Sequence, residues 1–91
     1  MLVFRYDPAR EDAQLQGLRD FIVPDVRRVP GFVAGYWTAD HARSETVTFI
    51  TFGSLRSAEA FAESTEELAP RQLTAGIELL SLRVVEIVAR A

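Results

Sequence analysis

Apolar and polar residues alternate from the start of the chain, which predicts a short β-strand over residues 2–6. Successive side chains of a strand point to opposite faces, so one face of this strand would carry Leu2, Phe4 and Tyr6. Asp7 and Pro8 follow and predict a helix start. An Asp side chain accepts hydrogen bonds from the free N–H groups of a first turn, and a proline at the first helical position loses no bond.

Apolar residues then recur at spacings of three and four, which predicts an amphipathic helix. The predicted inner face carries Leu15, Leu18, Ile22, Val26 and Val29. Pro24 interrupts this stripe, so we expect a kink or a break near residues 20–24, because proline lacks an N–H donor and its ring crowds the preceding turn. Pro30 is expected to end the helix, and Gly31 to make the sharp turn into the next strand.

Two further strands are predicted at residues 32–39 and 45–52, rich in Val, Thr, Ile and aromatic residues. The polar residues 40–44 between them have the length of a hairpin connection. If the first of these strands alternates regularly, Phe32 and Tyr36 share one face, and Trp37 points to the other.

Gly53 and Ser54 predict a turn, and Ser54 or Ser57 can cap a second helix, which we expect to extend to about Leu68 and to be interrupted at Pro70. Residues 71–75 can add one more helical turn, with Gly76 as a candidate left-handed cap. The last predicted strand, residues 77–89, is apolar on both faces.

The predicted order is therefore β-α-β-β-α-β in a single domain, residues 1–91. This order favours an α+β, ferredoxin-like fold, in which a four-stranded antiparallel sheet has both helices on one face. The opposite face should be polar if it is wet, yet either choice of face leaves large apolar residues uncovered. We therefore expect a homodimer joined through the sheet faces.

Composition excludes several classes of function. The chain has no Cys, which removes thiol nucleophiles and disulfides, and with a single His it has no zinc ligand set. All ten basic residues are Arg, they are scattered, and the net charge is −3, so we expect no nucleic-acid partner. We also expect no membrane span and no signal peptide, and hence a cytoplasmic protein.

The helix stop at Pro30-Gly31-Phe32, the strand with Tyr36-Trp37 and the turn at Phe52-Gly53-Ser54 into an Ala-rich helix carry a resemblance to a known family. With the β-α-β-β-α-β order, the chain resembles the dimeric α/β-barrel superfamily, and within it the small antibiotic-biosynthesis-monooxygenase-like domains. The resemblance spans nearly the whole chain. It implies a homodimer whose two sheets form a shared barrel, with a pocket between sheet and helices in each subunit.

The same resemblance implies a cofactor-independent monooxygenase that acts on a small aromatic or quinol-type substrate, with no cofactor and no metal. Once such a substrate loses a proton, its carbanion can pass an electron to oxygen, so the protein need supply only a dry pocket, orientation and one base or hydrogen-bond donor. The superfamily also contains haem-degrading enzymes, which ligate iron through a His on the second helix. This chain has no His between Ser54 and Leu68.

Candidate site residues follow from the strand faces. We expect Phe32 to pack beneath the first helix, which places Tyr36 on the same side, so the predicted pocket is lined by Tyr36, Phe32 and Phe4. Trp37 would then face the dimer interface. The catalytic candidates are Tyr36 and His41, the single His, which is expected in a solvated hairpin tip unless a dimer brings it over a neighbour's pocket.

Two hypotheses of different class stay open. The first is the cofactor-free oxygenase, and the second is a non-catalytic homodimer that binds a small apolar ligand or serves in a stress response. A closed pocket that holds a buried polar group and is accessible from solvent would favour the enzyme. A pocket filled by the chain's own Phe and Leu side chains would favour the ligand-binding protein.

Overall fold

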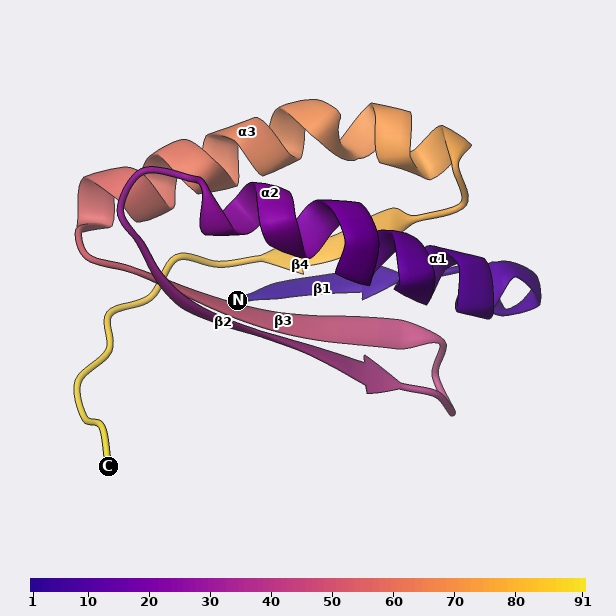
Figure 1. Ribbon diagram of the computed structural model, residues 1–91, viewed down its shortest axis with the longest axis horizontal. Helices are drawn as coiled ribbons and strands as arrows, with labels where there is room; N and C mark the ends of the chain where they lie inside the picture. Colours follow the sequence, from indigo (N-terminus) through magenta and orange to yellow (C-terminus); the bar gives the residue numbers. More distant parts are fainter.

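The computed structural model describes all 91 residues and contains a four-stranded antiparallel sheet with its helices packed against one face (Figure 1). The order of strands across the sheet is β2-β3-β1-β4. This α+β architecture is compatible with the predicted ferredoxin-like fold. The strands are β1 (Leu2–Arg5), β2 (Phe32–Asp40), β3 (Glu45–Phe52) and β4 (Glu78–Leu82).

The first helical stretch is composite rather than a single α-helix. It consists of a 3₁₀ turn, an α-helix, a π-helical turn and a second α-helix, namely η1 (Pro8–Arg10), α1 (Glu11–Gly17), η2 (Leu18–Ile22) and α2 (Val23–Arg27). Asp7 caps its start, as predicted, and accepts a hydrogen bond of 3.0 Å from the backbone N–H of Ala9. The irregularity predicted near Pro24 takes the form of the π-turn, in which the N–H of Val23 donates to the carbonyl of Leu18.

This π-turn changes which residues face the sheet. A π-turn holds one more residue than a regular turn, so the inward position after Leu18 passes from Ile22 to Val23. Ile22, predicted on the inner face, is 43% exposed, whereas Val23 is half-buried and Val26 is 8% exposed. The prediction for Ile22 was wrong because a strict 3.6-residue period does not continue through the π-turn at Leu18–Ile22.

Strands β2 and β3 form the predicted hairpin, but β2 does not alternate regularly. The ladder shifts register between Phe32, opposite Phe52, and Ala34, opposite Thr51, which is a β-bulge. A Cβ placed on Gly35 would contact the rings of both Trp37 and Phe32, so these residues share one face.

Helix α3 (Leu55–Thr74) begins at Ser54, whose hydroxyl accepts a bond of 3.2 Å from the N–H of Ser57. The helix continues through Pro70, so the predicted interruption was wrong. A single proline removes one hydrogen bond, and the turns on either side of it remain bonded. Gly76 has a φ of 85°, the predicted left-handed conformation.

Strand β4 is shorter than predicted and ends at Leu82 instead of continuing to residue 89. Its partner β1 begins at Leu2, which lies opposite Leu82, so no neighbouring strand extends beside the later residues. The last backbone bond of this ladder joins the N–H of Arg83 to the carbonyl of Met1 at 2.9 Å. Residues 83–91, which we call the tail, are exposed and lead away from the sheet (Figure 1).

The isolated chain has a small core. Five of its 91 residues are buried, namely Leu2, Tyr6, Val26, Thr48 and Thr65. The rings of Phe52 and Phe61, with centroids 5.3 Å apart, pack the end of β3 against α3. No helix has the combination of length and apolar character that crossing a bilayer requires.

Candidate functional site

Three polar side chains meet at the end of the sheet where β1 runs into η1. The hydroxyl of Tyr6 donates to Glu11 Oε1 at 2.6 Å, and Nδ1 of His41 lies 2.5 Å from the same oxygen. Glu11 therefore joins a buried phenol, 4% exposed, to an imidazole that is 70% exposed. An ionised carboxylate only accepts hydrogen bonds, so Nδ1 of His41 carries the proton in this pair.

The fold brings these residues together from three elements. Tyr6 directly follows β1, Glu11 is the first residue of α1, and His41 begins the turn between β2 and β3. The N–H of Tyr6 donates to the carbonyl of Ser44 at 2.9 Å, which ties the end of β1 to the hairpin. Ser44 has a φ of 53°, a left-handed conformation that closes the hairpin turn.

Glu11 and Tyr6 shift each other's pKa, in the directions that keep Glu11 ionised and Tyr6 protonated. The hydrogen bond to Glu11, aided by burial and by the negative charges of Glu11 and Asp40, raises the pKa of Tyr6 to about 12. Hydrogen bonds from Tyr6 and then from His41 hold the pKa of Glu11 below its ordinary value. At neutral pH Glu11 is thus an anion and Tyr6 a neutral donor.

His41 also lines a cavity of about 200 Å³ between β2, β3 and the first helical stretch. Its wall is mostly apolar, and the residues are Leu15, Leu18, Arg19, Val23, Trp37, Thr38, Ala39, His41 and Thr46. A dry cavity of about 150 Å³ binds benzene in a protein interior, so this space suits a ligand with one ring. We call it the Trp37 cavity.

The arrangement has the chemistry of a general base. Glu11 orients the imidazole of His41 through Nδ1, and Nε2 has no hydrogen-bond partner in the structure. A carboxylate that holds one ring nitrogen stabilises the imidazolium that forms when the other nitrogen takes a proton. The cavity wall contributes apolar contact, and no group of three His, Asp or Glu side chains is placed to hold a metal ion.

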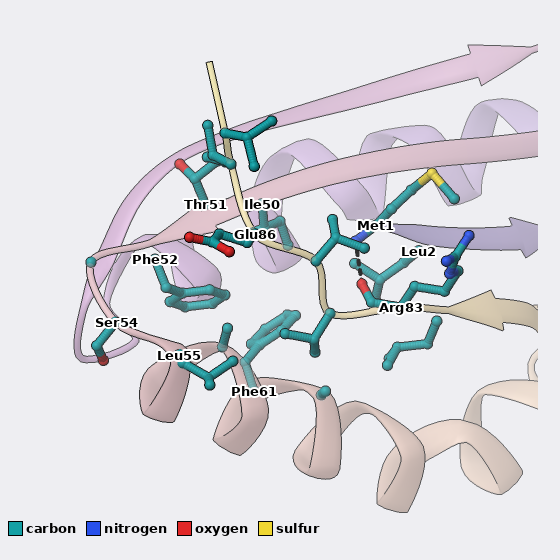
Figure 2. A pocket seen from close by; sticks show the side chains of 18 of the residues that line it. Met1, Leu2, Ile50, Thr51, Phe52, Ser54, Leu55, Phe61, Arg83 and Glu86 are labelled. Atoms are coloured by element: carbon teal, nitrogen blue, oxygen red, sulfur yellow. Dashed lines mark hydrogen bonds between the residues drawn. The ribbon is translucent and has the colours of Figure 1, made fainter. Parts of the chain in front are cut away.

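A second and larger hollow, which we call the tail groove, has a volume of about 870 Å³ and lies between the start of α3, the end of β3 and the tail (Figure 2). Figure 2 shows the rings of Phe52 and Phe61 beside Leu55 on one wall, with Arg83 opposite. The Met1 ammonium donates to the carbonyl of Arg83 at 2.8 Å. The pKa of this ammonium is lowered, mainly by burial and also by the positive charge of Arg83. No imidazole lies in this groove.

The structure corrects the assignment of the two neighbouring aromatic residues. Trp37, expected at a subunit interface, lines the helix-side cavity, and Tyr36, expected in the pocket, is 69% exposed on the opposite face. Phe32 is half-buried on the helix side, as expected, so the error arose from the β-bulge between it and Tyr36. Phe4 is half-buried, and neither Phe32 nor Phe4 lines the Trp37 cavity.

Sequence reasoning singled out His41 and missed both of its partners. Glu11 was not singled out, and Tyr6 was assigned only to a strand face. A topological signal was present, because β1 and β2 both pair antiparallel with β3 and so run in the same direction, with their carboxyl ends at the same end of the sheet. Residues that follow those two strands, such as Tyr6 and His41, are therefore brought close together.

Comparison with known proteins assigns no family to the chain. No protein-family model matches it. No curated protein matches its sequence either.

Proposed function

We propose that the Trp37 cavity is a site of proton abstraction, and that the protein is a cofactor-independent monooxygenase for a one-ring aromatic or quinol-type substrate. The observation that carries this proposal is Glu11, which holds His41 at the edge of an apolar cavity and is itself held by buried Tyr6. The resemblance to antibiotic-biosynthesis-monooxygenase-like domains supports the choice of reaction.

In this reaction Nε2 of His41 takes a proton from an acidic methylene, such as that of the keto form of a quinol, and the electron pair stays on the substrate. The resulting carbanion passes an electron to molecular oxygen. One oxygen atom enters the product as a carbonyl, and the other leaves as water with the two hydrogens of the methylene. The chain contributes the base and the orientation.

Oxygen consumption with a panel of one-ring quinols, measured with a chelator present, tests the proposal. We expect His41→Ala to lower the rate by about 100-fold or more, the usual contribution of a positioned base. Arg56→Gln is the matched control, because Arg56 is exposed on α3 and lines neither hollow. Tyr36→Phe should also leave the rate unchanged. Equal rates for the parent and His41→Ala would refute the assignment of the base.

We propose as a second candidate a non-catalytic protein that binds a small apolar ligand in the tail groove. The groove's volume of about 870 Å³ lies in the range of sites for drug-sized ligands, and 14 of its 20 lining residues are hydrophobic. Leu55→Gln should weaken binding of an apolar fluorescent probe, whereas Leu73→Gln should not, since Leu73 is similarly exposed on α3 outside the groove. An equal loss in both variants would indicate non-specific adsorption.

We also propose that either function operates in a homodimer joined through the open sheet faces, with the two sheets forming a barrel. A chain with five buried residues has little core of its own, and its open face exposes Tyr36 by 69% and Phe49 by 46% at directly paired positions. Tyr36→Glu should give a monomer in light scattering at micromolar concentration, while Leu68→Glu on α3 should not. A parent protein that is itself monomeric would refute the dimer.

A further inference from the structure

Arg19 is an unpaired cation on the wall of the Trp37 cavity. It lies in η2 and lines the cavity together with Trp37 and His41. It forms no ion pair and no side-chain hydrogen bond, whereas Arg10, Arg28 and Arg43 each pair with an Asp three residues away. Arg19 is an exposed residue that lines the cavity, and its positive charge has no counter-ion from the chain.

Regular helical spacing accounts for this placement. Leu15, Leu18 and Arg19 lie one turn apart on a helix, and the extra residue of η2 brings Val23 to the same wall. The helix thus places one charged residue on the wall of a cavity whose other helix residues are apolar. π-Turns of this kind are frequent at functional sites.

We infer that the Trp37 cavity selects ligands that carry an ionised oxygen, a carboxylate or a phenolate on one aromatic ring, and that Arg19 is the group that pairs with that oxygen. A guanidinium stays charged at any physiological pH and presents several donors in one plane, which suits a carboxylate or a phenolate. The ring of the ligand would lie against Trp37, with its opposite edge toward His41.

The inference deepens the proposed function and rests on it for the role of the charge in the reaction. When His41 takes a proton, the substrate keeps the electron pair and becomes an anion or gains a second negative charge. A guanidinium on the same cavity wall stabilises that charge as it develops. Glu11 cannot serve this role, because it is an acceptor already bonded to Tyr6 and His41.

Trp37 makes the inference directly measurable. It is the only Trp of the chain and forms part of the cavity wall, so its fluorescence reports occupancy of this site. Benzoate is the charged probe, and benzamide is its neutral counterpart of nearly the same shape. We expect benzoate to bind about fivefold more tightly than benzamide, the factor that corresponds to roughly 1 kcal/mol for a partly exposed ion pair.

Arg19→Gln should reduce the affinity for benzoate to that for benzamide and leave the benzamide affinity unchanged. Arg19→Lys should keep part of the preference, and Arg56→Gln should keep all of it. Equal binding of the two probes by the parent protein, an equal loss of both in Arg19→Gln, or no fluorescence response to either would overturn the inference.

Failure of the inference can be told apart from failure of the proposed function. A protein that consumes no oxygen with quinols but prefers benzoate through Arg19 retains an anion-selective site and loses the oxygenase assignment. A protein that oxidises quinols through His41 but binds benzoate and benzamide equally is an oxygenase in which Arg19 has no role in selection.

Discussion

Substitution of Gly35 by Ala tests the packing of the Trp37 cavity more sharply than any other single change. Gly35 lies two residues before Trp37 on β2, on the same face. A Cβ at this position would come within 2.7 and 2.8 Å of two carbon atoms of the indole ring. Carbon atoms pack without repulsion at about 3.5 to 4.0 Å, so the indole must move by roughly 1 Å.

The expected cost follows from this overlap. Adding a methyl group to a packed site costs about 1 to 3 kcal/mol when side chains must leave their preferred positions. For a domain of this size that loss lowers the Tm by roughly 5 to 20 °C. The displaced indole also forms the cavity wall, so the emission maximum of Trp37 should shift and the affinity for one-ring ligands should fall.

Gly17→Ala is the matched control, since it makes the same chemical change in α1. A Cβ at Gly17 meets no atom within 4 Å, and its backbone is ordinary right-handed helix. This variant should gain about 0.5 to 1 kcal/mol, because Ala restricts the unfolded chain and favours helix. Thermal unfolding and Trp37 fluorescence measure both variants. If Gly35→Ala matched the parent in Tm and emission, the close packing of the Trp37 ring on Gly35 would be wrong.

Three further predictions test the cluster and the backbone. Glu11 has a lowered pKa and Tyr6 a raised one, so the difference in unfolding free energy between the parent and Glu11→Gln should have its full size at about pH 7. It should decline as pH falls through Glu11's ordinary value of 4.5 and also as pH rises from 10 toward 12, as urea unfolding of both proteins across pH would show. Gly31→Ala should lose about 1 to 2 kcal/mol of stability because Gly31 has a φ of 84°, and a further amount because the new Cβ would clash with Ser57. In a Ser57→Gly background the loss caused by the clash should disappear, which chemical denaturation would measure. Pro70→Ala should raise stability by about 1 to 3 kcal/mol if α3 is continuous, and an unchanged Tm would argue for a break there.

Much of the secondary structure could be predicted because it depends on local patterns. The bounds of β3, the Asp7 and Ser54 caps and the left-handed Gly76 all follow from residues that act on their immediate neighbours. Residues 77–89 were harder to predict, since their apolar pattern is that of a strand whether or not a partner exists. Strand β4 ends at Leu82 because the first strand begins only at Leu2.

The candidate site was only partly predictable. His41 was a candidate because an imidazole titrates near neutrality, but its pairing with Glu11 joins residues 30 positions apart. The apolar stripe and the strand alternation describe only neighbouring residues, so neither shows which residues 30 positions apart come into contact. The pairing depends on two strand ends meeting at one end of the sheet, which is a property of topology.

The element order, the helix and strand starts, and the large apolar residues on both faces of the sheet follow from the pattern of residues along the chain. The face on which each aromatic residue lies depends on how the chain folds. One extra residue in the π-turn places Val23 on the cavity wall in place of Ile22, and one in the β-bulge reverses Tyr36 and Trp37 relative to Phe32. A periodic pattern is read from a fixed starting residue, so a single added residue reverses every later side chain of a strand.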